Sequence, residues 1–172
     1  MLSSVLKKET CAQCRFCCSF RRTSLWETEL FPMEFVEKYQ GRARFDIREI
    51  RGMRCGQLHL IDQYQTEDPD EEVPCTFLNG QAGCTLSEEE KPFDCRIWPL
   101  RVMETNGHLA VTLELTCPAI NQVGQDRMRE LVKGGLGEKI YAYAHTHPFI
   151  VKELTEGFAV LDEEEGRDVS AV

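Results

Sequence analysis

The chain has 172 residues, 42% of them hydrophobic, and a formal net charge of −9. This length and this apolar content are typical of a globular domain with its own core. The acidic balance argues against a nucleic-acid backbone as the main partner, so we expect no nucleic-acid binding. No apolar run reaches the roughly 20 residues of a membrane-spanning helix, so we expect no membrane insertion.

The cysteine content points to metal or redox chemistry. The chain contains 9 cysteines, a high number for its length. Residues 1–10 lack the apolar run of a secretory signal peptide, so we expect a cytoplasmic protein. In that reducing compartment, clustered cysteines bind metals or do redox chemistry more often than they form disulfides.

The first part of the chain shows few regular elements. Its pattern predicts an irregular segment organised by cysteines over residues 1–26. A short helix is expected over 28–39, with Thr28 as its N-cap and Pro32 in its first turn. A strand is expected over 58–64. On this reading the first 60 residues hold no large apolar core, so that bound metal would supply folding free energy.

A first hairpin is predicted around Asn106-Gly107, a dipeptide typical of two-residue turns. This turn places Leu100 opposite Leu113 and Val102 opposite Val111. Apolar residues then face each other across the two strands, which supports the register.

The same hairpin is expected to bring two distant cysteines together. Its register places Trp98 in the core opposite Leu115, and Cys117 near Cys95. Pro99 has no N–H to donate, which indicates an edge strand.

A second hairpin is predicted around Asn79-Gly80, with Cys75 directly opposite Cys84. Residues opposed in this way have Cβ atoms about 4.5–5.5 Å apart, close enough to share a metal. The same geometry suits a cross-strand disulfide. The expected reducing compartment favours the metal.

The remainder of the chain is predicted to be helical. Apolar residues from Ile120 to Val132 mark one helix, and those from Leu136 to Ala144 mark another that ends before Pro148. The expected fold class is α+β, a small metal-nucleated domain with two short β-hairpins and a few covering helices. We expect one cysteine-cluster domain over residues 1–160 and an acidic, disordered tail over 161–172.

The most informative motif is the cluster Cys11-x2-Cys14-x2-Cys17-Cys18. Soft sulfur ligands of this kind select zinc, copper(I) or an iron–sulfur cluster. The first three cysteines have the spacing that supplies three ligands to a [4Fe–4S] cluster in bacterial ferredoxins, although Cys18 then follows immediately. A tetrahedral zinc site built from these thiols and distant cysteines remains an alternative.

Four motifs in order extend this pattern: the cluster, Cys75-Thr-Phe-Leu with Cys84, the segment 91–99, and Cys117-Pro118. Together they resemble the CxxCxxCC (YkgJ-like) family, which is described as zinc- or iron-chelating. The resemblance covers residues 11–120 and departs from the family at Lys91, where arginine is usual, and at Leu86, where tyrosine is common. It implies the following metal ligands: Cys11, Cys14, Cys17, Cys18, Cys75, Cys84, Cys95 and Cys117. Cys55 lies outside the pattern, and its role stays open.

We therefore expect a cysteine-ligated metal-binding protein. Three closely spaced thiols suit the corner of a cube better than one ion, which favours a [4Fe–4S] cluster. Its role would be electron transfer or support of a partner enzyme for redox or modification chemistry; a flagellin lysine methylase has similar cysteine motifs. The alternative is a Zn²⁺-binding structural or interaction module. The sequence shows no catalytic residue, so whether the chain is an enzyme stays open.

Other polar residues receive simpler interpretations. His145 and His147 are expected to cap helix carbonyls or face solvent rather than bind metal. Arg15 and Arg96 adjoin candidate ligands and are expected to be exposed charges, with stabilisation of the thiolates as the alternative.

Overall fold

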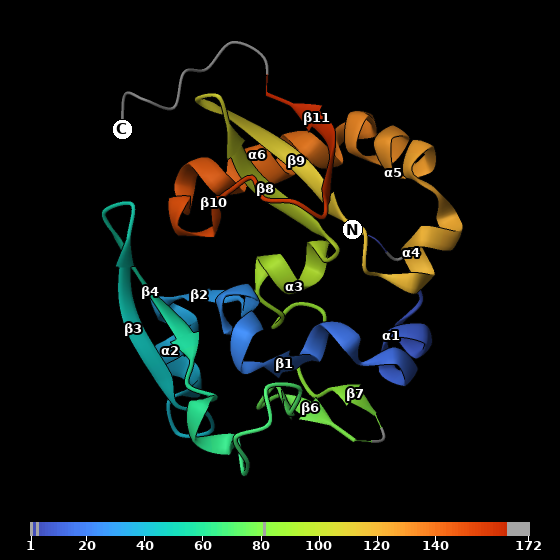
Figure 1. The fold of residues 1–172 in the computed structure, drawn as a ribbon. Helices are drawn as coiled ribbons and strands as arrows, with labels where there is room; N and C mark the ends of the chain where they lie inside the picture. The colour runs from blue at the N-terminus through green and yellow to red at the C-terminus, as the bar shows by residue number, and fades with distance from the viewer. Residues whose placement is uncertain (1, 3, 81, 165–172) are drawn as a thin grey trace. The chain divides into compact units, whose positions relative to one another are not determined.

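The computed structural model describes residues 2, 4–80 and 82–164, and it has the expected α+β class. Figure 1 shows short helices together with small separate sheets. The chain divides into two compact units, an N-terminal unit of Leu6–Arg96 and a C-terminal unit of Ile97–Val172 with Met1–Val5. This division at Arg96 is not indicated by the sequence, which predicted one domain over residues 1–160.

The N-terminal unit is built from short elements and three small sheets. The sheets have the strand orders β1-β5, β2-β4-β3 and β6-β7. Its elements in chain order are α1 (Lys8–Cys14), the 3-10 turn η1 (Phe16–Cys18), β1 (Ser19–Arg21), η2 (Arg22–Glu27), β2 (Leu30–Pro32), α2 (Met33–Tyr39), β3 (Phe45–Ile50), β4 (Met53–Leu58), η3 (Ile61–Gln63), β5 (Glu72–Pro74), β6 (Leu78–Asn79), β7 (Gly83–Cys84) and α3 (Phe93–Ile97).

An aromatic cluster forms the core of this unit, contrary to the expectation for the first 60 residues. Phe35 stacks on Phe31 with ring centroids 4.8 Å apart and lies 4.5 Å from Tyr39. Phe77, from a distant part of the chain, packs edge-on against Phe35 and Tyr39. Each such pair stabilises the fold beyond the area that it buries. Phe35 and Tyr39 lie one turn apart on α2, but the core is completed by side chains from segments as distant as Phe77.

The predicted helix over 28–39 is shorter in the structure. Leu30–Pro32 pairs with β4 as strand β2, and α2 begins only at Met33 after an extended Pro32. Thr28 is buried and is the C-cap of η2, whereas the N-cap of α2 is Pro32. The helix prediction was wrong over Thr28–Pro32 because pairing with β4 outweighs local preference.

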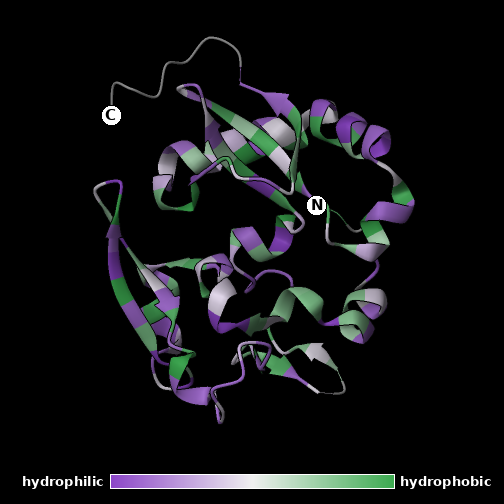
Figure 2. Ribbon diagram, in the orientation of Figure 1, coloured by the Kyte–Doolittle hydropathy of each residue, from purple (hydrophilic) through white to green (hydrophobic). Residues whose placement is uncertain are grey.

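The expected strand over 58–64 was also wrong. The strand β4 ends at Leu58, and Ile61–Gln63 forms a 3-10 turn. The hairpin of β3 and β4 was not predicted, because its turn is Arg51-Gly52, with φ values of 50° and 73°, rather than Asn-Gly. Figure 2 shows hydrophilic and hydrophobic residues alternating along β3.

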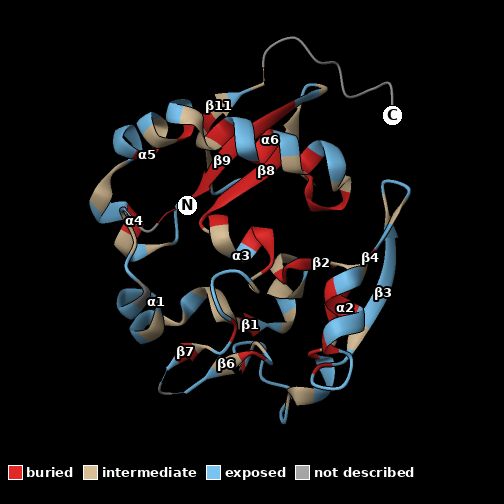
Figure 3. Ribbon diagram, turned by 180° about the vertical axis from the view of Figure 1, so that it is seen from behind, coloured by how far each residue is buried: buried red, intermediate tan, exposed pale blue. Residues whose placement is uncertain are grey.

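The C-terminal unit is a four-stranded sheet with helices. The strand order is β10-β8-β9-β11, and Ile140 and Ala144 of α6 are buried on it. In Figure 3, β8 and β9 are largely buried with α6 across them. The elements are β8 (Leu100–Thr105), β9 (His108–Glu114), α4 (Pro118–Val123), α5 (Gln125–Leu131), the π-turn η4 (Val132–Leu136), α6 (Gly137–Thr146), η5 (Pro148–Ile150), β10 (Lys152–Glu153) and β11 (Phe158–Glu163).

The first predicted hairpin is confirmed in turn and register. Leu100 pairs with Leu113 and Val102 with Val111. The predicted edge strand was wrong, because β8 lies between β10 and β9. Pro99 is tolerated because it precedes β8, and β10 pairs only with Met103 and Glu104.

The expected core position of Trp98 opposite Leu115 was wrong in burial. Trp98 is half-buried beneath the Arg101 guanidinium, 4.7 Å from the ring centroid, and Leu115 is 39% exposed. The register itself continues beyond Leu100 and Leu113, since the Glu114 N–H donates to the Pro99 carbonyl at 2.9 Å, so the prediction was wrong in burial and not in register.

The predicted helix over 120–132 is divided at Gly124, whose φ is 87°, into α4 and α5. The following helix ends at Thr146, before Pro148, as predicted. Part of the predicted tail is ordered, since Leu161–Glu163 completes β11, whereas residues 165–172 lie outside the described residues. Among the described residues, no helix has the length and apolar character needed to span a bilayer.

The contact between β4 and α2 gives a stability prediction. A Cβ on Gly56 would overlap Val36 Cγ2, whereas a Cβ on Gly41 would meet no atom within 4 Å. We expect Gly56→Ala to lower the free energy of unfolding by about 1–3 kcal/mol through overpacking. Gly41→Ala should change it by less than about 0.5 kcal/mol. Urea denaturation measures both, and adding Val36→Ala to Gly56→Ala should recover part of the loss.

Candidate metal centre

The N-terminal cysteine cluster lies on two consecutive short elements. Cys11 and Cys14 are exposed on α1, and Cys17 and Cys18 are half-buried in η1. Arg15 turns the chain between them with a left-handed φ of 57°, and its carbonyl accepts the N–H of Cys18 at 2.9 Å. A C-terminal residue in this conformation stops a helix, which sets where α1 gives way to η1.

Strand pairing brings Cys75 to this cluster. The strands β1 and β5 are antiparallel, with Ser19 opposite Pro74. Just beyond them, the Cys75 N–H donates to the Cys18 carbonyl at 2.8 Å. Two cysteines that are far apart in the sequence are therefore adjacent in the backbone ladder.

The register predicted for the second hairpin was wrong. The structure pairs Leu78 with Cys84 and Asn79 with Gly83, so the turn is longer than Asn79-Gly80. The positive φ of Gly83, 77°, accommodates this longer connection. Cys75 thus lies before β6 rather than opposite Cys84, and both cysteines pack at the margin of the aromatic core.

The side chains of the vicinal pair Cys17 and Cys18 are joined by a hydrogen bond. The Cys17 thiol donates a hydrogen bond to the Cys18 sulfur, which raises the pKa of Cys17 and lowers the pKa of Cys18. Burial also raises the pKa of Cys17, as do the nearby charges of Glu29 and Cys11. Cys18 is therefore the thiol of the pair that loses its proton more readily.

Cys75 and Cys95 are influenced by the same charges. Burial raises the pKa of Cys75 to about 12, and the charges of Cys18, Glu29 and Cys84 contribute. The pKa of Cys95, on α3, is also raised, first by desolvation and then by Glu29, Cys75 and Cys18, although the residue keeps exposed surface. Thiols from η1, from the end of β5 and from α3 are thus close enough for their charges to interact.

Two charged residues at this site were missed by the sequence interpretation. Glu29 is only 7% exposed, and its charge raises the pKa of Cys17, Cys75 and Cys95. No motif marks it, because its proximity comes from the fold.

Lys91 supplies a positive charge, which lowers the pKa of Cys18. Burial lowers the pKa of Lys91 itself, but its hydrogen bond to Glu88 and the charges of Cys84 and Cys95 raise it more. It stands where the resembling family has arginine, so a sequence signal for it existed. Of the two arginines considered, Arg15 donates to the Ala12 carbonyl at 3.0 Å, and Arg96 lies over the Phe93 ring.

The donor set suits a soft metal, but its geometry is not that of a coordination site. All nine cysteines are free thiols, and thiolate is the preferred ligand of zinc and iron–sulfur clusters. Across residues 2, 4–80 and 82–164, no three His, Cys, Asp or Glu side chains are arranged to hold a metal ion. The buried Arg96 Nε has no hydrogen-bond partner in the described part of the chain, which leaves a donor for a further acceptor beside Cys95. The residues fit a thiolate-bound metal in chemistry and neighbourhood, and ligation would require side-chain movement.

The remaining cysteines lie elsewhere. Cys117 belongs to the C-terminal unit, at the N-cap of α4, so its convergence with Cys95 stays a prediction. Cys55 is fully buried in β4, where desolvation raises its pKa, and the charge acting on it is that of Arg48. This position agrees with a core role for Cys55.

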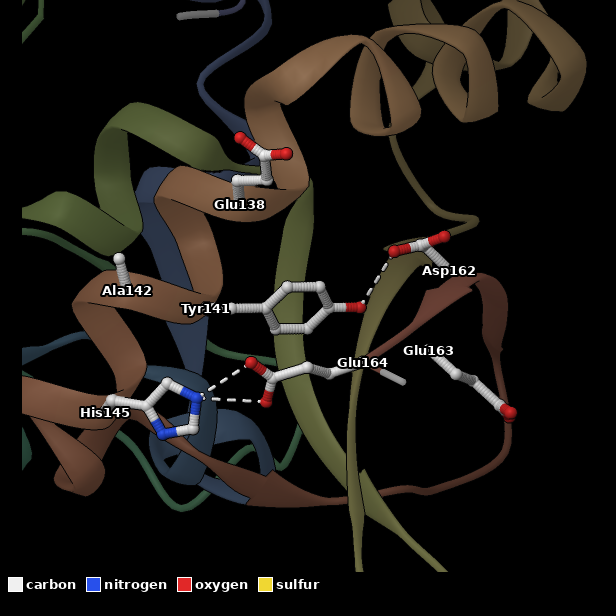
Figure 4. Close-up of a pocket in the computed structure, with 7 residues that line it drawn as sticks. All are labelled: Glu138, Tyr141, Ala142, His145, Asp162, Glu163 and Glu164. Carbon is white, nitrogen blue, oxygen red and sulfur yellow. Dashed lines mark hydrogen bonds and ion pairs between the residues drawn. The ribbon is translucent and has the colours of Figure 1, made fainter. Parts of the chain in front are cut away.

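The C-terminal unit contains an acidic pocket of about 430 Å³ between α6 and β11 (Figure 4). His145 Nε2 lies 2.9 Å from a carboxylate oxygen of Glu164, and the Tyr141 hydroxyl donates to Asp162 at 3.1 Å. His147 stacks on Tyr143 with centroids 4.0 Å apart. Both histidines thus have protein partners at the end of the helix.

Comparison with known proteins identifies no relative: no family model, curated protein or solved structure matches this chain. The resemblance in the cysteine motifs therefore stays a prediction.

The approach of α1 to β7 predicts a sensitive position. A Cβ on Gly83 would lie 2.9 Å from Ala12 Cβ, and the backbone there has a φ of +77°. We expect Gly83→Ala to cost about 1–3 kcal/mol and to increase hydrogen exchange in α1. Gly80→Ala is the matched control, because a Cβ there meets no atom within 4 Å. Equal exchange in the two variants would contradict this packing.

The position of Glu29 predicts thiol reactivity. Its charge raises the pKa of Cys95, so Glu29→Gln should lower that pKa and enlarge the thiolate fraction at neutral pH. Each unit of lowering gives about tenfold more thiolate, the nucleophilic form. The rate of iodoacetamide labelling of Cys95 in chelator-treated protein, followed by mass spectrometry, measures this change. Glu34→Gln, an exposed change on α2, should leave the rate unaltered.

Proposed function

We propose that this chain is a cysteine-ligated metal-binding protein whose site is centred on the N-terminal unit. The observation that carries the proposal is the proximity of thiols from separate segments: the Cys75 N–H donates to the Cys18 carbonyl, and the charge of Cys18 raises the pKa of both Cys75 and Cys95. Cys11 and Cys84 act on this group as well. The proposed ligands are Cys11, Cys14, Cys17, Cys18, Cys75, Cys84 and Cys95, with Cys117 as a further candidate.

The charges around these thiols favour the binding of a metal cation. Several partly buried thiols lie near the buried Glu29, and ionising them without compensation would be costly. A bound metal offsets that cost, and the thiols release their protons as it binds. The aromatic core means that metal binding would add to, rather than replace, the apolar stabilisation of this unit.

We propose that the bound cofactor is an iron–sulfur cluster of the [4Fe–4S] type. Cys11, Cys14 and Cys17 lie on adjacent turns, α1 and η1, and three closely spaced thiols suit the corner of a cubane cluster better than a single ion. Such a cluster would supply one-electron chemistry, and the chain's own residues would bind it and set its surroundings.

A zinc-binding structural or interaction module is the second candidate. Cys75 and Cys84 pack against the aromatic core, as ligands of a structural ion would. Zinc there would hold β5 and β7 in place without redox chemistry.

A protein partner is compatible with either metal. We propose that this partner is a redox or modification enzyme and that the two proteins meet in the cytoplasm. Phe16, between Cys14 and Cys17, is 52% exposed, and Trp26 is 49% exposed. Large aromatic residues at the surface are enriched in protein interfaces. Phe16 lies within the cysteine segment itself, which supports docking close to the metal.

Anaerobic purification with iron, sulfide and zinc analysis and a visible spectrum tests the proposal. Matched iron and sulfide with charge-transfer absorption would establish the cluster. Stoichiometric zinc without colour would establish the second candidate. Metal-free protein with full secondary structure and no uptake of either metal would overturn both.

Substitution of the central thiols gives the corresponding prediction. We expect Cys17→Ser, Cys75→Ser and Cys95→Ser each to lose most of the bound metal, because hydroxyl oxygen is a poor ligand for soft metals. Cys55→Ala, which removes a thiol outside this group, should keep full metal content. Plasma mass spectrometry measures the metal content of each variant. Full metal content in all three serine variants would contradict the proposed ligand set.

A further inference from the structure

We propose that the free edge of β3 pairs with β3 of a second copy of this chain, joining two N-terminal units in a symmetric dimer. In the sheet β2-β4-β3, the strand β3 lies at the end and pairs only with β4 among the described strands. Its four central residues, 46–49, are all exposed (Figure 3). An open strand edge of this length is a template for pairing with another chain.

The backbone alternation shows which residues face that edge. The backbone carbonyl of Arg44 accepts a hydrogen bond from the His59 N–H at 3.0 Å, and Ile50 pairs with Met53 across the two-residue turn. Bonding alternates along an antiparallel strand, so the even-numbered residues 44–50 direct their backbone groups to β4. The odd-numbered residues 45, 47 and 49 direct theirs to the free edge.

A two-fold axis through Ile47 gives a self-complementary register. Ile47 then faces Ile47 of the second copy, and Asp46 faces Arg48 of the second copy, with the reverse pair completing the symmetry. Opposite charges directly across an antiparallel pair are favourable, whereas like charges are unfavourable. Asp46 and Arg48 of the second copy form a non-hydrogen-bonded pair, the kind of pair in which opposed side chains come closest.

The neighbouring symmetric registers are unfavourable. A two-fold axis through position 46 would place Asp46 against Asp46, and one through position 48 would place Arg48 against Arg48. Of these three axes, only the one at Ile47 gives both Asp46 and Arg48 an opposite charge. It places the third charged residue, Glu49, opposite Phe45 of the second copy. Charge complementarity thus selects both a second copy as the occupant and the register of its pairing.

The side chain of Ile47 supports the same arrangement. It is 45% exposed, and its cross-strand neighbour on β4 is Gly56, which has no side chain to cover it. Ile47 of a second copy would provide the missing apolar contact. Phe45–Ile50 contains no lysine or proline and its pairing with β4 has no bulge, so its protection against pairing rests on its charged side chains, which this register matches with opposite charges at Asp46 and Arg48.

Charge reversal tests this dimer. We expect wild-type protein, as purified, to sediment as a concentration-dependent dimer. Arg48→Asp and Asp46→Arg should each weaken self-association at least tenfold, because each places like charges opposite one another. The double variant Asp46→Arg/Arg48→Asp restores opposite charges and should dimerise again. Glu37→Arg, the same charge change at an exposed site on α2, is the control and should dimerise like wild type.

Mixing the two single variants gives the sharpest test. An Asp46→Arg chain presents two arginines and an Arg48→Asp chain two aspartates, so together they should form a heterodimer although each alone is monomeric. Heterodimer formation also shows that both variants are folded, which far-UV circular dichroism checks separately. Wild-type protein that stays monomeric throughout a concentration series, or single variants that dimerise like wild type, would overturn the proposal.

Discussion

The pairing of β1 with β5 is the constraint on which the N-terminal unit depends. It places Phe20 opposite Val73, both buried in the aromatic core, and extends into the hydrogen bond from the Cys75 N–H to the Cys18 carbonyl. This ladder joins the start of the chain to a segment more than fifty residues later. Loop closure of that length is entropically costly, and the burial of apolar side chains on both strands offsets the cost. The gathering of the thiols follows from the same pairing.

Charge is the second organising factor of the thiol group. Cys18 is favoured as a thiolate by the Cys17 thiol and by Lys91, whereas burial and Glu29 oppose ionisation of Cys75 and Cys95. The group therefore carries little negative charge by itself and gains more as protons leave. A cation that binds thiolates resolves this conflict, which is why the metal-binding proposal rests on the electrostatics as well as on the motif.

Local patterns predicted the elements that depend on local interactions. The Asn106-Gly107 hairpin was predicted correctly because apolar and polar residues alternate along its strands over many residues. A shift of the pairing by one residue would turn all of the buried apolar side chains to the opposite face. The Asn79-Gly80 hairpin has strands of two residues each, too short for a pattern to specify register, and the turn shifted. Leu30–Pro32 became a strand because β4 lies beside it, which no helix-propensity argument can detect. The candidate site was predicted in its cysteines, but Glu29 was missed because it acts from outside every motif.

The sequence by itself determined the α+β class, the central hairpin of the C-terminal unit and the set of cysteines available for chemistry. Residue types and spacings encode these features directly, since side-chain softness and strand alternation are local properties. Only the tertiary structure decided which thiols are neighbours, that Glu29 and Lys91 modulate them, and that β3 is left with an open edge. Those features arise from contacts between segments distant in the chain, and their physical basis is the shared burial of side chains such as Phe35 and Phe77.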